Sequence, residues 1–219
     1  EQLRSGWGAL LKPLAWQGVL CYGPSRSSKV TFTNPASFLK NWNGLPDPAE
    51  AAPAVIKRYL SAYGPASPET FDAWLSRNSN KKSTLKSWFA SLGEQIVEVR
   101  VKDETRYLLA EHEDELAATR PSRATHLLGA FDQFVLGPGT KDTHMLANKH
   151  RSRVSKAAGW IAPVLTQGGR ITGVWEMDDG NLVVTPFPGE QAPPSKVLED
   201  AAARLAAVHG LVKVTPRTG

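Results

Sequence analysis

Apolar positions in the central part of the chain recur with helical spacing in three short stretches, residues 47–63, 67–75 and 80–92. The first stretch starts with a capping aspartate followed by Pro48, a residue that suits the first turn of a helix. The third stretch has apolar side chains at i, i+3, i+4 and i+7 and stops at Gly93. The pattern therefore predicts three consecutive helices.

After the third predicted helix, apolar and polar residues alternate strictly along the chain. Valines alternate with charged residues over residues 97–101, a polar turn follows at residues 102–104, and residues 105–110 return with apolar side chains on one face. This pattern predicts a β-hairpin. Three helices followed by a hairpin is the order of a winged helix-turn-helix, which we predict for residues 47–120.

The beginning of the chain has a shorter version of the same pattern. Apolar residues at helical spacing predict a helix over residues 3–14, and two β-prone runs follow at residues 19–22 and 30–33 with a polar loop between them. A helix leading into a hairpin resembles the second half of a unit like residues 47–110. We therefore interpret residues 1–46 as a partial winged helix.

The remainder of the chain is dominated by β-prone runs. An acidic and then alanine-rich stretch, residues 111–123, predicts a short helix or linker. Three later runs at residues 161–166, 170–177 and 182–186, separated by glycine-containing turns, predict a small antiparallel meander. Ser195 is predicted to cap a last helix that ends at Gly210.

Composition narrows the class of protein. With 219 residues, 41% hydrophobic and 21% charged, the chain is typical of a globular protein, which excludes a disordered tail, a collagen-like fibre and a coiled coil. No run approaches the roughly 18 apolar residues of a membrane span, and the first residues do not follow the pattern of a secretory signal. Cys21 is the only cysteine, so an intrachain disulfide and a thiolate zinc site are excluded. We expect a soluble, cytoplasmic and monomeric protein. The first residue, Glu1, suggests a processed product or a fragment.

The formal net charge of +5 (26 Lys and Arg against 21 Asp and Glu) is unevenly distributed. Four cations and no acid lie in the turn before the third central helix and in its first half, among side chains that can bind phosphate. The candidate DNA contacts there are Arg77, Lys81, Lys82, Ser83, Thr84 and Lys86, and Lys102 and Arg106 at the hairpin add to them. A basic helix N-terminus favours contact with the phosphates of DNA. The alternative is a solvated basic face without a partner.

A second basic run covers residues 141–156, with only Asp142 opposing it. Its candidate contacts are Lys141, His144, Lys149, His150, Arg151, Arg153 and Lys156. The run could be a strand-forming finger that enters a groove or a flexible surface loop, and the spacing favours neither. The two histidines are too far apart to indicate a metal site without carboxylate help, so surface or phosphate-binding roles are expected instead. No metal or other cofactor is expected.

The usual catalytic motifs are absent from the chain. Asp132 lies between two phenylalanines and must find a partner if it is buried, either as a structural acid tied to an arginine or to backbone amides, or as a catalytic group. The structural role is favoured. Trp160 and Trp175 are expected to pack in the core of the meander rather than stack on a base.

Several motifs, in the same order along nearly the whole chain, resemble the family of winged-helix proteins to which the AlkZ-type DNA glycosylases belong. They are Gly6-Trp7-Gly8, Leu10-Leu11-Lys12-Pro13, Leu20-Cys21-Tyr22-Gly23-Pro24, Val30-Thr31-Phe32, Arg58-Tyr59-Leu60-Ser61-Ala62-Tyr63-Gly64-Pro65-Ala66, Leu127-Leu128-Gly129-Ala130-Phe131-Asp132-Gln133 and Gly159-Trp160-Ile161-Ala162-Pro163-Val164-Leu165. The resemblance implies an α+β fold, with tandem winged helix-turn-helix units followed by a small antiparallel β-barrel-like domain with a C-terminal helix at residues 121–219. It also implies a basic concave surface around double-stranded DNA.

The glycosylases of this family excise alkylated or crosslinked purines without metal or cofactor, using a Gln-x-Gln or Gln-x-Asp motif near their N-terminus. No glutamine of this chain is followed two residues later by Gln or Asp. The resemblance therefore implies that the catalytic unit precedes Glu1, and that this chain is the duplex-DNA-binding portion of a glycosylase-like repair protein associated with the nucleoid. The alternative is a non-catalytic winged-helix protein of transcription or chromatin.

Overall fold

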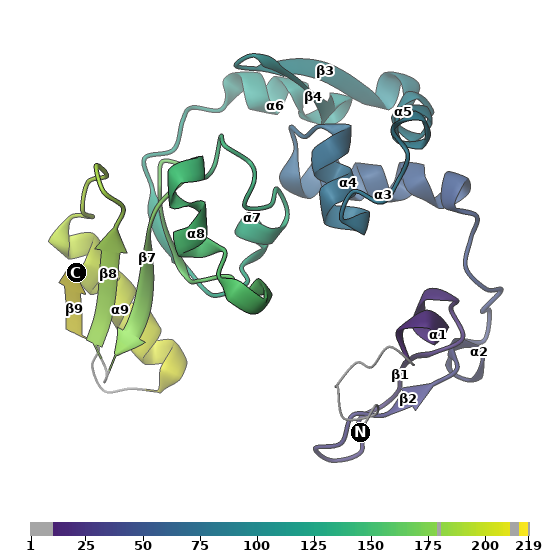
Figure 1. Cartoon of the computed structure of the whole chain (residues 1–219), viewed down its shortest axis with the longest axis horizontal. Helices are drawn as coiled ribbons and strands as arrows, with labels where there is room; N and C mark the ends of the chain where they lie inside the picture. Colours follow the sequence, from purple (N-terminus) through teal and green to yellow (C-terminus); the bar gives the residue numbers. More distant parts are fainter. Residues whose placement is uncertain (1–10, 179–180, 211–214, 219) are drawn as a thin grey trace. The chain divides into compact units, whose positions relative to one another are not determined.

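The computed structural model describes residues 11–178, 181–210 and 215–218 of the chain (Figure 1). It has mixed α and β structure, as the sequence predicted. The chain divides into two compact units, one ending at Ala52 and the other beginning at Pro53.

The described part of the first unit, up to residue 47, contains short elements. A helical turn, α1 (Lys12–Trp16), precedes the antiparallel pair β1 (Cys21–Tyr22) and β2 (Phe32–Thr33), in which Cys21 lies opposite Thr33. The hairpin is therefore confirmed, with shorter strands than predicted. Most of the helix predicted over residues 3–14 falls on residues 1–10, outside the described residues, and so do the family motif residues at positions 6–8 and 10. A further turn, α2 (Pro35–Phe38), was not predicted.

The three central helices are confirmed as α3 (Pro48–Tyr63), α4 (Pro68–Ser76) and α5 (Lys82–Ala90). The hydroxyl of Ser67 accepts a hydrogen bond from the amide of Thr70 at 3.1 Å, which caps α4. The core between the helices is aromatic, because the ring of Phe71 meets those of Tyr59 and Phe89 edge to face at 5.3 and 5.7 Å.

The predicted hairpin is also confirmed. Strands β3 (Ile96–Val101) and β4 (Glu104–Leu109) pair antiparallel after the short helix η1 (Gly93–Gln95). Backbone hydrogen bonds in both directions between Tyr107 and Ala66 attach β4 to the segment between α3 and α4. The helices η2 (Ala110–His112) and α6 (Glu113–Ala118) then occupy the stretch predicted as a short helix or linker.

The second unit also contains a five-stranded sheet in the order β5-β6-β7-β8-β9. Its strands are β5 (Thr125–Leu128), β6 (Val164–Gln167), β7 (Arg170–Asp178), β8 (Asn181–Pro186) and β9 (Thr215–Thr218). The three middle strands confirm the predicted meander, although Asp179 and Gly180 of one predicted turn lie outside the described residues. The sheet is not wholly antiparallel as expected, because β9 pairs parallel to β8. Among the described strands β5 and β9 form its edges, so the sheet is open.

Helix α9 (Ser195–His209) confirms the predicted last helix and ends at Gly210, whose φ of 65° is left-handed. Its N-cap is Pro194 rather than Ser195, one residue earlier than predicted. The face of α9 that carries Leu198 and Ala202 packs with Leu165 and Leu182 of the sheet in one apolar cluster.

Between β5 and β6 the chain forms the short helices α7 (Gln133–Leu136), η3 (Asn148–His150), α8 (Arg151–Val154) and η4 (Ala157–Gly159). The basic run 141–156 is therefore neither a strand-forming finger nor a flexible loop. It is anchored because Leu146 and Val154 are fully buried in a cluster with Val164 and Phe187. No helix within the described ranges is long and apolar enough to cross a membrane.

Candidate nucleic-acid interface

The turn between α4 and α5 has a tightly defined backbone. Arg77 and Asn78 both adopt left-handed conformations, with φ of 59° and 64°. The amide of Arg77 closes the end of α4 on the carbonyl of Asp72, and the amide of Asn78 donates to the same carbonyl at 3.2 Å. Left-handed backbone is uncommon for residues other than glycine, so this turn needs support from its surroundings.

Asp72 supplies that support. Its side chain is buried, with 2% of the residue exposed, and its carboxylate accepts hydrogen bonds from the hydroxyl of Ser76 and from the side-chain amide of Asn80 at 2.6 Å. The backbone amide of Asn80 also donates to this carboxylate, at 3.3 Å. Asp72 thereby ties the last turn of α4 to the residues that lead into α5. Sequence reasoning missed Asp72, although polar residues at positions 72, 76 and 80 are spaced as one face of a continued helix.

The charged side chains carried by this turn and by α5 are exposed. Arg77, Lys81, Lys82, Ser83 and Lys86 all lie on the surface, and Thr84 is half-buried. No acidic residue occurs in the sequence from position 73 to position 93. The free amides at the start of α5 add partial positive charge to that of the lysines. This end of α5 can therefore hold phosphate or another anion.

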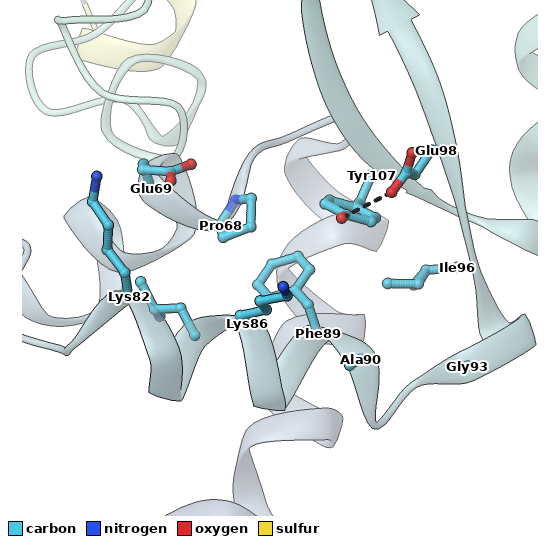
Figure 2. A pocket seen from close by; sticks show the side chains of 11 residues that line it. Pro68, Glu69, Lys82, Lys86, Phe89, Ala90, Gly93, Ile96, Glu98 and Tyr107 are labelled. Atoms are coloured by element: carbon cyan, nitrogen blue, oxygen red, sulfur yellow. Dashed lines mark hydrogen bonds between the residues drawn. The ribbon is translucent and has the colours of Figure 1, made fainter.

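A hollow of about 630 Å³ lies beside α5 (Figure 2). Its lining includes Lys82 and Lys86 of α5 together with Glu69 of α4 and Glu98 of β3. The hydroxyl of Tyr107 donates to Glu98 at 3.1 Å, and burial together with this bond raises the pKa of Tyr107. The hollow is therefore lined by charges of both signs, and its lining alone does not select an anion.

A second hollow of about 540 Å³ brings parts of both basic segments together. Its lining includes Asn78 from the turn, Arg106 from β4 and Lys141 from the second basic run. Glu69 lines both hollows, so they adjoin on one surface. Lys102 lies exposed at the tip of the hairpin, in the turn between β3 and β4.

Arg106 does not project from the hairpin as the sequence analysis expected. Its side chain is 9% exposed, and its guanidinium binds Asp142 Oδ2 at 2.9 Å and Glu104 Oε2 at 3.0 Å. Burial lowers the pKa of Arg106, but the hydrogen bonds to the two carboxylates outweigh burial and the pKa is raised. His144 Nε2 lies 3.3 Å from the same Glu104 oxygen, and both neighbours hold the pKa of Glu104 below its usual range. These side chains connect the hairpin to the 141–156 run and leave Arg106 little freedom to bind phosphate.

The rest of the second basic run divides into exposed and anchored residues. Lys149, Arg153 and Lys156 are exposed, whereas Arg151 is half-buried and donates from Nε to Thr140 at 3.2 Å. His150 is 4% exposed and stacks on Phe187 with ring centroids 4.4 Å apart. A surface or phosphate-binding role for His150 is therefore wrong, because its ring lies in the core.

Three further candidates are placed by their contacts. Asp132 caps α7 by accepting a hydrogen bond from the amide of Phe134 at 2.8 Å, which is a structural role. Trp175 is half-buried against the sheet cluster and donates to the carbonyl of Leu128 at 2.8 Å, as expected of a core residue. Trp160 differs from the prediction, because it lies exposed against the ring of Phe131. Within the described residues no group of three or more His, Cys, Asp and Glu side chains is placed to hold a metal ion.

Comparison with known proteins gives consistent matches. The family described as DNA glycosylase AlkZ-like matches residues 2–208. An interstrand DNA cross-link repair glycosylase of Streptomyces sahachiroi is 55% identical over 218 residues, which are 99% of this chain and 59% of the relative. The solved structure of Streptomyces sahachiroi DNA glycosylase AlkZ superposes with a TM-score of 0.92 at 54% identity, covering 99% of this chain and 59% of that one. The chain thus spans about three fifths of the length of the relatives it matches, and it belongs to the AlkZ-like DNA glycosylase family.

Proposed function

We propose that the protein is a DNA repair glycosylase that removes crosslinked or alkylated purines, and that residues 11–218 contribute a large part of its grip on duplex DNA. The observation that carries the proposal is the exposed, acid-free basic end of α5, in a chain 55% identical to a cross-link repair glycosylase over nearly its whole length. A glycosylase must hold DNA before it can expose a base, so a phosphate-binding surface fits this activity.

In this proposal residues 47–120 act as a winged helix-turn-helix. Helix α5 is the recognition helix, and the hairpin β3–β4 is the wing. Lys81, Lys82 and Lys86 contact phosphates, with Arg77 and the hydroxyls of Ser83 and Thr84 beside them. The fixed geometry of the Asp72 turn supports this assignment, because a helix that enters a groove needs a defined direction relative to the helix before it.

The exposed cations of the 141–156 run extend the same interface. Lys141 lines a hollow together with Asn78 of the α4–α5 turn, and Lys149, Arg153 and Lys156 lie exposed on η3, on α8 and just after α8. We divide the protein as the sequence suggested, with a partial winged helix at residues 1–46 and the sheet domain at residues 121–219.

The proposed reaction is hydrolysis of the N-glycosidic bond of a damaged purine. An alkylated or crosslinked purine is positively charged, so its bond to the sugar is already weakened and it leaves as a neutral base. Catalysis then requires a water molecule positioned by hydrogen-bond acceptors and a site that stabilises the cationic sugar. We assign no residue of this chain to those steps.

The proposal is tested with a duplex that carries one N7-alkylated purine or one interstrand crosslink. Incubation with the full-length protein should release the damaged base and leave an abasic site, which alkali converts to a strand break. The undamaged duplex is the control and should stay intact. Tight binding without base release, together with a footprint at a particular undamaged sequence, would favour a non-catalytic winged-helix protein and refute the glycosylase.

A further inference from the structure

Two aromatic residues of the 129–163 segment form an exposed pair. Phe131 and Trp160 are 42% and 53% exposed, and their ring centroids lie 4.9 Å apart with the planes at 84°. An edge-to-face pair is a favourable arrangement, but it leaves ring faces that the partner does not cover. Single exposed apolar residues are ordinary, whereas two large rings held together at the surface suggest a binding role.

Both rings are positioned by constrained backbone. Phe131 has a φ of 57°, which is uncommon for a bulky residue, and the Asp132 cap of α7 follows it directly. Trp160 lies at the end of a tight turn in which its carbonyl accepts from the amide of Lys156 at 2.8 Å and its amide donates to the carbonyl of Ala157 at 3.2 Å. Strained residues of this kind persist only where the surrounding structure holds them, and they cluster at functional sites.

The surroundings of the pair are basic. Lys156 is bonded to Trp160 through the backbone, and Arg153 lies one turn earlier on α8, with both side chains exposed. The sequence from position 143 to position 160 has no acid. The nearby Asp132 caps α7, and Asp142 is paired with Arg106. Negative charge on a ligand would therefore be attracted to this surface.

We propose that Phe131 and Trp160 form a stacking site for an unpaired base of a bound DNA strand, with Arg153 and Lys156 on the adjacent phosphates. The same combination occurs on surfaces that bind single-stranded DNA, in which aromatic rings stack on the bases and cations contact the phosphate backbone. A fully paired duplex keeps its base faces stacked inside, so the site selects DNA in which a base has left the helix. The inference rests on the proposed function, because it requires that the protein binds DNA.

The test uses the 219-residue chain and three fluorescein-labelled probes of the same sequence, a fully paired duplex, a duplex with one bulged nucleotide and the single strand. The variants are Phe131→Ala, Trp160→Ala and the double variant, with Trp160→Phe as the conservative replacement. Trp16→Ala removes another exposed tryptophan and is the matched control. Thermal unfolding followed by circular dichroism checks that each variant is folded, which is expected because both rings lie at the surface.

The wild-type chain should bind the bulged duplex more tightly than the paired one. The double variant should lose about tenfold in affinity for the bulged and single-stranded probes and less than twofold for the paired duplex. Trp160→Phe should restore most of the loss, and Trp16→Ala should behave as wild type. Equal affinity of wild type and double variant for the bulged probe would overturn the stacking site and indicate that the pair covers another part of the protein or a protein partner. Absence of binding of all three probes by the wild-type chain would instead refute the proposed DNA-binding function itself.

Discussion

Replacing Asp72 tests whether this side chain acts on DNA binding by holding the α4–α5 turn in place or through its negative charge. The Asp72 carboxylate is buried and accepts hydrogen bonds from Ser76 and from two groups of Asn80. Hydrogen bonds to a charged group contribute about 1.5–3 kcal/mol each, and those that share an acceptor do not add fully. We therefore expect Asp72→Ala to lower the free energy of unfolding by about 3 kcal/mol, since it also leaves the backbone amide of Asn80 without its acceptor.

The isosteric change Asp72→Asn keeps one acceptor oxygen and should lower the free energy of unfolding by about 1 to 2 kcal/mol. For a chain of this size each kcal/mol corresponds to about 2–4 °C in Tm. Urea unfolding followed by circular dichroism measures both variants. Asp200→Ala, which removes an exposed acid from α9, is the control and should stay within about 0.5 kcal/mol of wild type. A loss below that limit in Asp72→Ala would refute the idea that this carboxylate holds the turn.

Positioning of the turn and Coulomb attraction predict opposite changes in DNA affinity for the same variants. Removal of a negative charge from a DNA-facing surface should tighten binding if Coulomb attraction alone matters. If Asp72 positions the turn, Asp72→Asn should instead weaken binding to duplex DNA, by about tenfold or 1.4 kcal/mol. Fluorescence anisotropy at fixed salt measures the change. Tighter binding by Asp72→Asn would contradict the positioning role.

The buried polar groups of the second unit lead to two more predictions. Arg106→Gln should lower the free energy of unfolding by about 3 kcal/mol, because it leaves the Asp142 carboxylate, 5% exposed, without its partner, and adding Asp142→Asn should recover part of that loss. Simply additive losses in the double-mutant cycle would argue against the pair. Burial lowers the pKa of His150, and the nearby charges of Lys149 and Arg153 lower it further. The unfolded chain therefore takes up a proton at this position before the folded chain does, as the pH falls below about 6.5. The folded protein consequently loses stability as the solution becomes more acidic. His150→Phe should therefore lose less stability than wild type between pH 7 and pH 5 in urea unfolding, and an equal loss would contradict the assignment.

The elements that the sequence predicted well depend on local signals. The capping residue Ser67, the proline at position 48 and the apolar spacing of residues 80–92 all act within one or two turns, so the three central helices could be recognised from the chain alone. The parallel strand β9 could not, because Thr215–Thr218 contains a proline and polar residues, and becomes a strand only by pairing with β8. Its signal lies in the partner strand rather than in its own residues.

The candidate interface shows the same division. The distribution of charge in the sequence was enough to identify the lysines of α5 as candidate DNA contacts, and these lysines are exposed. Charge could not distinguish Arg106 from these lysines, because its partner Asp142 lies 36 positions away in the sequence. Trp160 was expected in the core because tryptophans usually pack there, but its place at the end of a tight turn puts it at the surface against Phe131. For Arg106 a contact between distant segments decides whether the side chain is available to a ligand, and for Trp160 a tight local turn decides it.

The salt dependence of duplex binding tests the central claim most directly. Three lysines that each neutralise a phosphate contribute about 0.9 each to the slope of log K against log salt concentration. The variant Lys81→Ala, Lys82→Ala, Lys86→Ala should therefore bind duplex DNA more weakly, with a slope reduced by about 2 to 3. A control that removes Lys40, Lys196 and Arg204 changes the net charge equally at exposed positions elsewhere and should keep the wild-type slope. An unchanged affinity and slope in the α5 variant would contradict the assignment of this helix to DNA.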